Sequence, residues 1–145
     1  MTTADDAYRV IRQAVLKDAP GALAGIRAAR TYEHAAARLA REQVTRARTD
    51  GGSWLDIGRA LGLEGDSDYD VMVAAYDQSA GRDGIGTPRP YHFPCGTCGQ
   101  RIRDNGPWSA NPLDEEEGHA DSCTRFAEAV RAYRAQWDEE DGTDD

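Results

Sequence analysis

Residues 95–123, CGTCGQRIRDNGPWSANPLDEEEGHADSC, contain three cysteines and a histidine at spacings typical of a metal site. Cys95 and Cys98 are separated by two residues, which lets two sulfurs on one tight turn reach the same ion at about 2.3 Å. Twenty residues later, His119 and Cys123 supply a second pair. Their four-residue offset predicts that both lie on one face of a helix. We therefore predict one structural Zn²⁺ ion with closed tetrahedral Cys3His coordination.

The residues around these ligands predict a small zinc-finger module made of a short β hairpin and a helix. Residues 101–103 suit a short strand that ends in the turn 104–107, and apolar residues recur at helical spacing over 126–137. Such a module is too small to fold on its apolar core alone, so the metal is expected to contribute much of its stability. The expected core residues are Phe93, Ile102, Trp108, Phe126, Val130, Tyr133 and Trp137.

Apolar residues upstream repeat at helical spacing. The pattern predicts helices over about 4–18, 20–49, 53–62 and 67–80, each ending at or within two residues of a glycine or proline. We predict a mainly α fold with a helical domain over 1–83, a Gly- and Pro-rich linker over 84–94 and the zinc module over 95–137. The last eight residues, 138–145, are expected to form an acidic disordered tail.

The run SWLDIGRALGL at 53–63 resembles the helix-turn-helix segment of small actinobacterial regulators and of proteins similar to sigma-factor region 4. Gly58 stands four positions before the turn glycine, Gly62. The run GHADSC at 118–123, after a C-x2-C pair, likewise resembles small zinc-finger proteins of actinobacteria and their phages or plasmids. The resemblance implies a helix-turn-helix in the N-terminal domain and a role in transcription or mobile-element biology through DNA.

The sequence departs from that pattern after Leu63, where residues 64–70 are acidic and no Lys or Arg occurs between Arg59 and Arg82. Carboxylates repel phosphates, so DNA contacts would depend on other residues. The candidates for DNA contact are Arg38, Arg41, Arg46, Arg48, Ser67 and Gln78. The alternative is an acidic protein-interaction adaptor that keeps the helix-turn-helix as a scaffold and does not bind DNA. Its candidate partner-binding residues are Asp66, Asp68 and Asp70.

Composition limits the remaining function classes. The formal charge is −9, and residues 95–145 hold 13 acidic against 5 basic side chains, which disfavours nucleic acid without excluding it. We expect no membrane contact and a cytoplasmic location, since no apolar run approaches the roughly 20 residues of a membrane span and residues 1–10 lack the basic start and apolar stretch of a signal peptide. In a reducing compartment, three cysteines favour a metal over disulfides. A Cys95–Cys98 redox pair is a weaker alternative. His34 and His92 are expected to be ordinary surface residues, and residues 114–117 a solvated acidic loop. No enzyme motif and no small-molecule substrate are evident.

Overall fold

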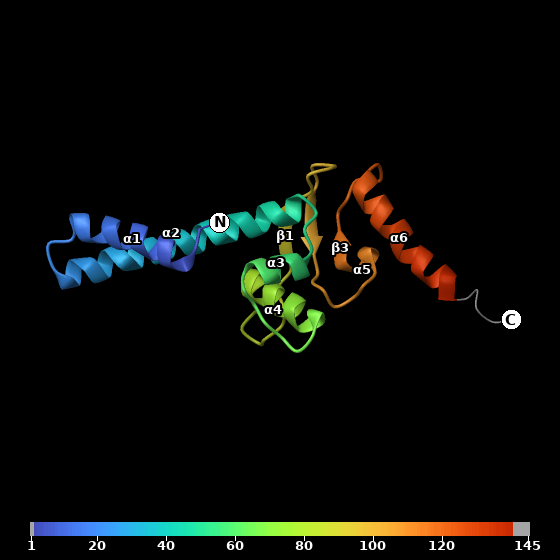
Figure 1. The fold of residues 1–145 in the computed structure, drawn as a ribbon. Coiled ribbons are helices and arrows are strands. Elements are labelled where there is room, and N and C mark those ends of the chain that lie inside the picture. Colours follow the sequence, from blue (N-terminus) through green and yellow to red (C-terminus); the bar gives the residue numbers. More distant parts are fainter. Residues whose placement is uncertain (1, 141–145) are drawn as a thin grey trace. The chain divides into compact units, whose positions relative to one another are not determined.

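The computed structural model describes residues 2–140 and is shown in Figure 1. The chain divides into two compact units between Gln43 and Val44, and each is described by itself. The long helix α2 (Ala22–Thr49) begins in the first unit and ends in the second. The predicted mainly helical fold with a small C-terminal Cys/His module is confirmed. None of the described helices is both long enough and apolar enough to cross a membrane.

The first unit is a helical hairpin in which α1 (Ala4–Asp18) lies beside the first part of α2 (Figure 1). Thr3 begins α1 with a capping box, since its hydroxyl accepts from the Asp6 amide at 3.1 Å and its own amide donates to Asp6 at 3.3 Å. The partly buried residues of α2 in this unit are all small, Ala24, Gly25 and Ala28, and among residues 2–43 Val15 is the one apolar side chain that is buried. The hairpin therefore has little core of its own.

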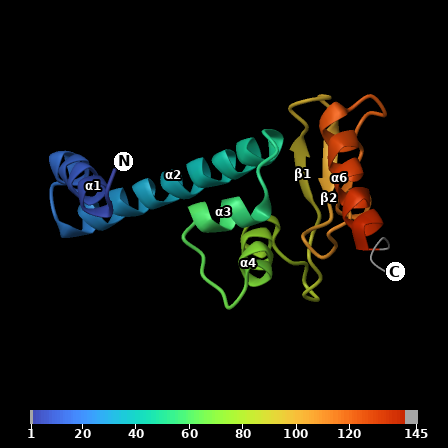
Figure 2. The same cartoon turned by 45° about the vertical axis from the view of Figure 1, so that its right-hand side comes forward.

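The second unit contains the short helix α3 (Trp54–Ala60) and the longer helix α4 (Asp68–Ala80), which lie side by side (Figure 2). Ser53 and Ser67 cap them, each accepting a hydrogen bond from an amide of the first turn. The helices cross closely at Gly58, where a Cβ would lie 2.6 Å from the Val71 side chain. The core beneath them consists of Val44, Trp54, Ile57, Ala75 and Tyr76.

The rest of the second unit is built on a three-stranded antiparallel sheet in the order β1 (Tyr91–Pro94), β2 (Arg101–Asp104) and β3 (Glu116–Glu117). Phe93 pairs with Ile102 across β1 and β2, and both side chains are buried on one face. The four-residue helix α5 (Pro112–Glu115) leads into β3, and α6 (Thr124–Glu140) follows the last cysteine.

Several features differ from the sequence-based expectations. Residues 91–94 of the predicted linker form β1, because Phe93 is buried opposite Ile102. The predicted hairpin gains a third strand from residues 116–117, which were expected in a solvated loop. Trp108 and Trp137 are 42% and 55% exposed and do not belong to the Phe93 core.

The division of the chain and its tail also differ from expectation. Residues 44–80 pack in one unit with the Cys/His module, so the compact units do not coincide with a boundary at 84–94. Of the predicted acidic tail, residues 138–140 continue α6. Residues 141–145 lie outside the described part of the chain.

Candidate metal centre

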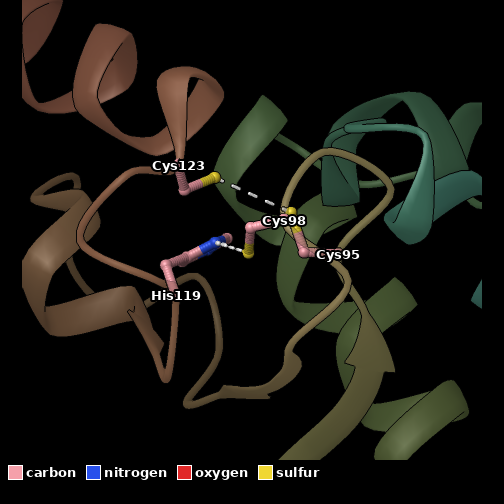
Figure 3. A group of neighbouring side chains, drawn as sticks. All are labelled: Cys95, Cys98, His119 and Cys123. Atoms are coloured by element: carbon pink, nitrogen blue, oxygen red, sulfur yellow. Dashed lines mark hydrogen bonds between the residues drawn. The ribbon is translucent and has the colours of Figure 1, made fainter.

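The four predicted ligands converge at one point between the β1–β2 connection and the start of α6 (Figure 3). Their ligand atoms all lie within 4.8 Å of one another. The Cys95 and Cys123 sulfurs are 3.9 Å apart, as are the Cys98 sulfur and His119 Nδ1. Sulfurs bound tetrahedrally at about 2.3 Å from an ion would be about 3.8 Å apart. The cluster is therefore able to hold a metal ion.

The first pair of ligands is positioned by the turn that joins β1 to β2. Cys95 follows β1 directly, and the Gly99 amide donates to the Cys95 carbonyl at 2.8 Å. Gly99 has a φ of +72°, a conformation that residues with a Cβ rarely adopt. The glycine thus closes a tight turn that brings both sulfurs to the same side.

The second pair does not lie on a helix, so this part of the prediction is wrong. His119 and Cys123 occupy the loop and turn that precede α6. The Cys123 carbonyl accepts from the Ala127 amide at 3.0 Å, which makes Cys123 the residue that begins the helix. The Cys123 amide donates to Ala120 at 2.9 Å, and this turn aims the histidine and the cysteine at the same point.

Backbone amides favour the thiolate form of the first two cysteines. Hydrogen bonds from the amides of Ala120 and Gln100 lower the pKa of Cys98 to about 6. Burial acts in the opposite direction on Cys95, but amides of the same turn and the nearby Arg125 guanidinium leave its pKa below the ordinary value. Arg125 Nη2 lies 3.4 Å from the Cys95 sulfur. Because a metal binds the deprotonated sulfur, this environment favours metal binding.

For the other two candidate ligands, Cys123 and His119, burial has the largest single effect on the pKa. Burial raises the pKa of Cys123, although the Phe126 amide opposes the effect. The His119 ring stacks on Phe126 with 4.3 Å between ring centroids. Burial lowers the pKa of His119, but the hydrogen bonds to Glu116 and to the neighbouring cysteines, together with the Glu116 charge, outweigh it and the net shift is upward. The stacking fixes the plane of the imidazole, and Glu116 fixes its rotation.

A chain of charged side chains leads from His119 away from the cluster. His119 Nε2 donates to Glu116 at 2.6 Å, which leaves Nδ1 facing the sulfurs. The other Glu116 oxygen accepts from Arg48 at 2.6 Å. A metal-binding histidine that donates its second nitrogen to a carboxylate is a common arrangement, because the carboxylate fixes the tautomer and raises the basicity of the ligand.

The same chain continues into the helical core of this unit. Arg48 is 5% exposed, and its guanidinium also donates to Asp104 at 2.7 Å. Asp104 is fully buried and accepts from the Trp54 indole at 2.9 Å and from the Gly106 amide at 2.8 Å. Burial raises the pKa of Asp104, and Arg48 opposes that shift.

Sequence reasoning missed this network. The sequence analysis gave Arg48 as a candidate for DNA contact, which is wrong, since a buried guanidinium held by two carboxylates cannot reach a phosphate. One signal was available: Arg48 follows the buried Val44 by four residues and so lies on the same face of the helix.

The other DNA-contacting candidates are exposed. In the first unit, Arg38 pairs with Glu42 at 3.0 Å, and Arg41 is solvent-accessible. In the second unit, Arg46 lies 4.0 Å from Asp50, Ser67 caps α4 and Gln78 is exposed near the end of that helix.

The acidic candidates lie at the start of α4. Asp66, Asp68 and Asp70 are all exposed, and Asp68 accepts from Arg59 at 3.3 Å. His34 and His92 are exposed, as expected, and neither belongs to the metal cluster.

Comparison of the chain with protein families, curated protein sequences and solved structures finds no match. The class of this protein is therefore described by its fold and its candidate metal site alone. The chain is a mainly helical protein whose small antiparallel sheet carries a Cys3His cluster able to hold a metal ion.

Proposed function

We propose that the cluster of Cys95, Cys98, His119 and Cys123 holds one structural Zn²⁺ ion. Three thiolates and one imidazole form a donor set that suits zinc, and four protein ligands complete a tetrahedral shell. A closed shell leaves no position for a substrate, so the proposal assigns the metal a structural role and assigns no reaction to the chain. The three unpaired cysteines favour a reducing, cytoplasmic setting.

We further propose that the chain is a zinc-stabilised regulatory adaptor, in which the helix-turn-helix-like pair α3 and α4 serves as a scaffold for binding a basic protein partner. The observation that carries this proposal is the charge of the exposed start of α4. Asp66, Asp68 and Asp70 are all exposed there, and no Lys or Arg occurs along the helix.

The nearest arginines do not offset this charge for an incoming phosphate. Arg59 donates to Asp68 at 3.3 Å, and Arg82 donates to Asp77 at 2.7 Å, so each is already paired with a carboxylate of α4. A DNA duplex approaching α4 would meet repulsive carboxylates, whereas a basic protein surface would meet complementary charge.

An aromatic side chain at the same place supports a protein partner. Tyr69 is 49% exposed between Asp68 and Asp70. Tyrosine is enriched at the centres of protein interfaces because its ring is a large apolar contact and its hydroxyl still finds a hydrogen bond. A tyrosine surrounded by carboxylates therefore suits a basic partner that also offers an apolar pocket.

DNA binding is the second candidate, and the close crossing of α3 and α4 favours it. A side chain at Gly58 would meet Val71, so the two helices approach as closely as the resemblance to a helix-turn-helix implies. Ser67 and Gln78 are exposed on α4 and are the side chains that would reach bases.

One pair of variants separates these functions. The triple change Asp66→Asn, Asp68→Asn and Asp70→Asn removes three charges from the start of α4. A control removes three exposed charges from α6 through Glu128→Gln, Asp138→Asn and Glu139→Gln. Proteins captured from cells by the full chain are identified and quantified for each variant, and circular dichroism verifies that both variants keep their helices.

The adaptor proposal expects one basic partner that the α4 variant loses by at least tenfold and that the α6 variant keeps. Partners that the α4 variant retains in full contradict it. In parallel, the full chain is used to select from a pool of random DNA duplexes. Retention of specific sequences, with an affinity that falls steeply with salt, would support the DNA candidate instead.

A further inference from the structure

The C-terminus of α2 is closed by two glycines that leave the last carbonyl of the helix without a donor. The Gly52 amide donates to the Ala47 carbonyl at 2.8 Å, and the Gly51 amide donates to the Arg48 carbonyl at 3.0 Å. Gly51 has a φ of +90°, so these bonds form the Schellman motif that ends many helices. The motif supplies no donor for the next carbonyl, that of Thr49.

The turn that carries the first two cysteines supplies that donor. The Gly96 amide, one residue after Cys95, donates to the Thr49 carbonyl at 3.0 Å. The approach is so close that a Cβ at Gly96 would lie 2.7 Å from the Thr49 oxygen. Gly96 is not among the glycines with positive φ, so glycine is needed there for this contact and not for the shape of the turn. The cysteine turn is therefore the outer part of the α2 cap.

The same end of α2 also meets the helix that follows the last cysteine. Arg125, at the start of α6, lies with Nη2 3.4 Å from the Cys95 sulfur and with Nη1 3.5 Å from the Arg48 carbonyl. A cation is favourable at both places, because a thiolate is anionic and the C-terminus of a helix carries a partial negative charge. One guanidinium therefore contacts a candidate ligand and the helix end together.

The last turns of α2 are also the part of the helix that packs against α3. Val44 is 8% exposed and shares the helical core with Trp54 of α3. The Arg48 guanidinium lies 5.2 Å from the centroid of the Trp54 ring and donates to the Asp104 carboxylate. The Asp104 carbonyl accepts from the Tyr76 hydroxyl of α4 at 3.0 Å. Order at the end of α2 therefore supports the positions of both α3 and α4.

We propose that the structural zinc site is also a regulatory site, at which metal binding completes the cap of α2 and so stabilises the α3–α4 pair. With the metal bound, the turn at 95–99 is fixed and presents the Gly96 amide to Thr49. Without it, the α2 cap keeps only its Schellman motif, residues 44–49 fray, and the core contacts of Val44 weaken. The surface of α4 is then less ordered, so partner binding there responds to the supply of zinc. The inference rests on the proposed zinc site and does not depend on which partner binds α4.

Hydrogen–deuterium exchange of the full chain, with and without zinc, measures the effect on each helix. Zinc is expected to slow exchange over 44–49, 54–60 and 68–80 by about fivefold or more, because coupling between two sites typically corresponds to about 5–150-fold. Helix α1 lies in the other unit and should exchange at the same rate in both states. A chain that takes up no zinc refutes the proposed metal site and this inference with it. A chain that binds zinc without slower exchange at 44–49 overturns this inference alone.

Gly96→Ala tests the cap without changing a ligand. Its Cβ keeps the amide of residue 96 away from Thr49, so exchange over 44–49 should stay faster than in wild type when both chains are saturated with zinc. Because coupling is reciprocal, the zinc dissociation constant, measured by competition with a chelator, should rise by about fivefold or more. Thr97→Ala, at an exposed residue of the same turn, should leave both quantities as in wild type. Wild-type exchange at 44–49 in zinc-saturated Gly96→Ala overturns the proposal.

A second pair of variants tests the coupling from the helix side and leaves the cysteine turn unchanged. Val44→Ala weakens the packing of the end of α2, and Val44 belongs to the helical core and not to the Cys/His cluster. Val15→Ala is the matched control, since Val15 is 9% exposed in the other unit. Val44→Ala should raise the zinc dissociation constant by about fivefold or more, and Val15→Ala should leave it unchanged. A zinc dissociation constant in Val44→Ala equal to that of wild type overturns the proposal.

Discussion

Arg48, one residue before the end of α2, forms a buried ion pair with Asp104 at the end of β2, with 2.7 Å between Nη2 and Oδ2. The same guanidinium contacts Glu116, which in turn accepts a hydrogen bond from His119 of the Cys/His cluster. Within the second unit, the Cys/His cluster and the Trp54 core are therefore joined by one continuous set of hydrogen bonds between charged side chains and the Trp54 indole.

Removal of the buried cation is expected to destabilise this unit strongly. Arg48→Met leaves Asp104 and Glu116 without their counter-charge, and loss of one partner of a buried pair costs about 3–5 kcal/mol. Urea unfolding followed by circular dichroism measures the change. Arg46→Met, two residues earlier on an exposed side of α2, is the control and should cost less than about 1 kcal/mol. Equal losses of unfolding free energy in the two variants would show that the buried ion pair contributes no more to stability than the exposed one.

Glu116 is expected to control metal affinity without binding the metal. Glu116→Gln removes the carboxylate that fixes His119, and loss of such a partner lowers metal affinity by about 10–100-fold. Competition with a zinc chelator measures the affinity. Glu117→Gln, on the neighbouring exposed residue of β3, should leave it unchanged. An unaltered affinity in the Glu116 variant would remove the carboxylate from the metal site.

The metal is expected to stabilise residues 91–126, which include the sheet and the four candidate ligands. The purified chain should contain about one zinc ion by mass spectrometry, and Cys123→Ser should lose it. Hydrogen exchange should then become fast over 91–126, while Ser122→Ala, an adjacent exposed residue, keeps both metal and protection. Metal content of zero in the wild-type chain, with full protection, would contradict the assignment.

Gly58 is expected to be needed for the close approach of α3 and α4. A Cβ there would lie 2.6 Å from Val71 Cγ1 and 3.0 Å from the Val71 carbonyl, so Gly58→Ala must push the helices apart. Overpacking of this kind costs about 1–3 kcal/mol. At Gly84 a Cβ would meet nothing within 4 Å, so Gly84→Ala serves as the control in the same denaturant series. If the Gly58→Ala chain were as stable as wild type, the contact between α3 and α4 at Gly58 would have room for a methyl group, which would contradict the prediction.

Glu115 is expected to make stability depend on pH. Burial raises its pKa from the ordinary value of 4.5 to about 7, although Arg48 opposes the shift. Because the folded chain binds this proton more tightly than the unfolded chain, the Glu115 contribution to the free energy of unfolding rises as pH falls from about 7 to 4.5. Glu115→Gln should therefore be more stable than wild type by about 3 kcal/mol at pH 8, with the difference becoming small near pH 4.5.

Denaturant unfolding at several pH values measures that difference, and subtraction of the wild-type value at each pH removes the effects of other groups. Glu128→Gln, an exposed position on α6, should show no such trend. A difference between Glu115→Gln and wild type that stays constant across the range would contradict the shift.

Local features of the fold followed directly from local sequence. The predicted helix over 4–18 matches α1, and the helix over 67–80 begins one residue later at Asp68, because serine or threonine caps and apolar spacing act within a few residues. The two ligand pairs were likewise visible as spacings. The prediction that His119 and Cys123 lie on one helix was wrong, because a four-residue offset also fits a turn that ends where a helix begins.

By itself, the sequence determined the long helices and the four residues of the Cys/His cluster, since caps, turn glycines and ligand spacings depend on neighbours along the chain. Only the tertiary structure decided that Arg48 is buried and that Glu116 accepts a hydrogen bond from His119. Those roles arise from residues 56 and 68 positions away from Arg48, and an arginine on a helix carries no local mark of the carboxylates that will surround it. Burial of charge is a property of the assembled unit, because only packing can remove the water that would otherwise solvate it.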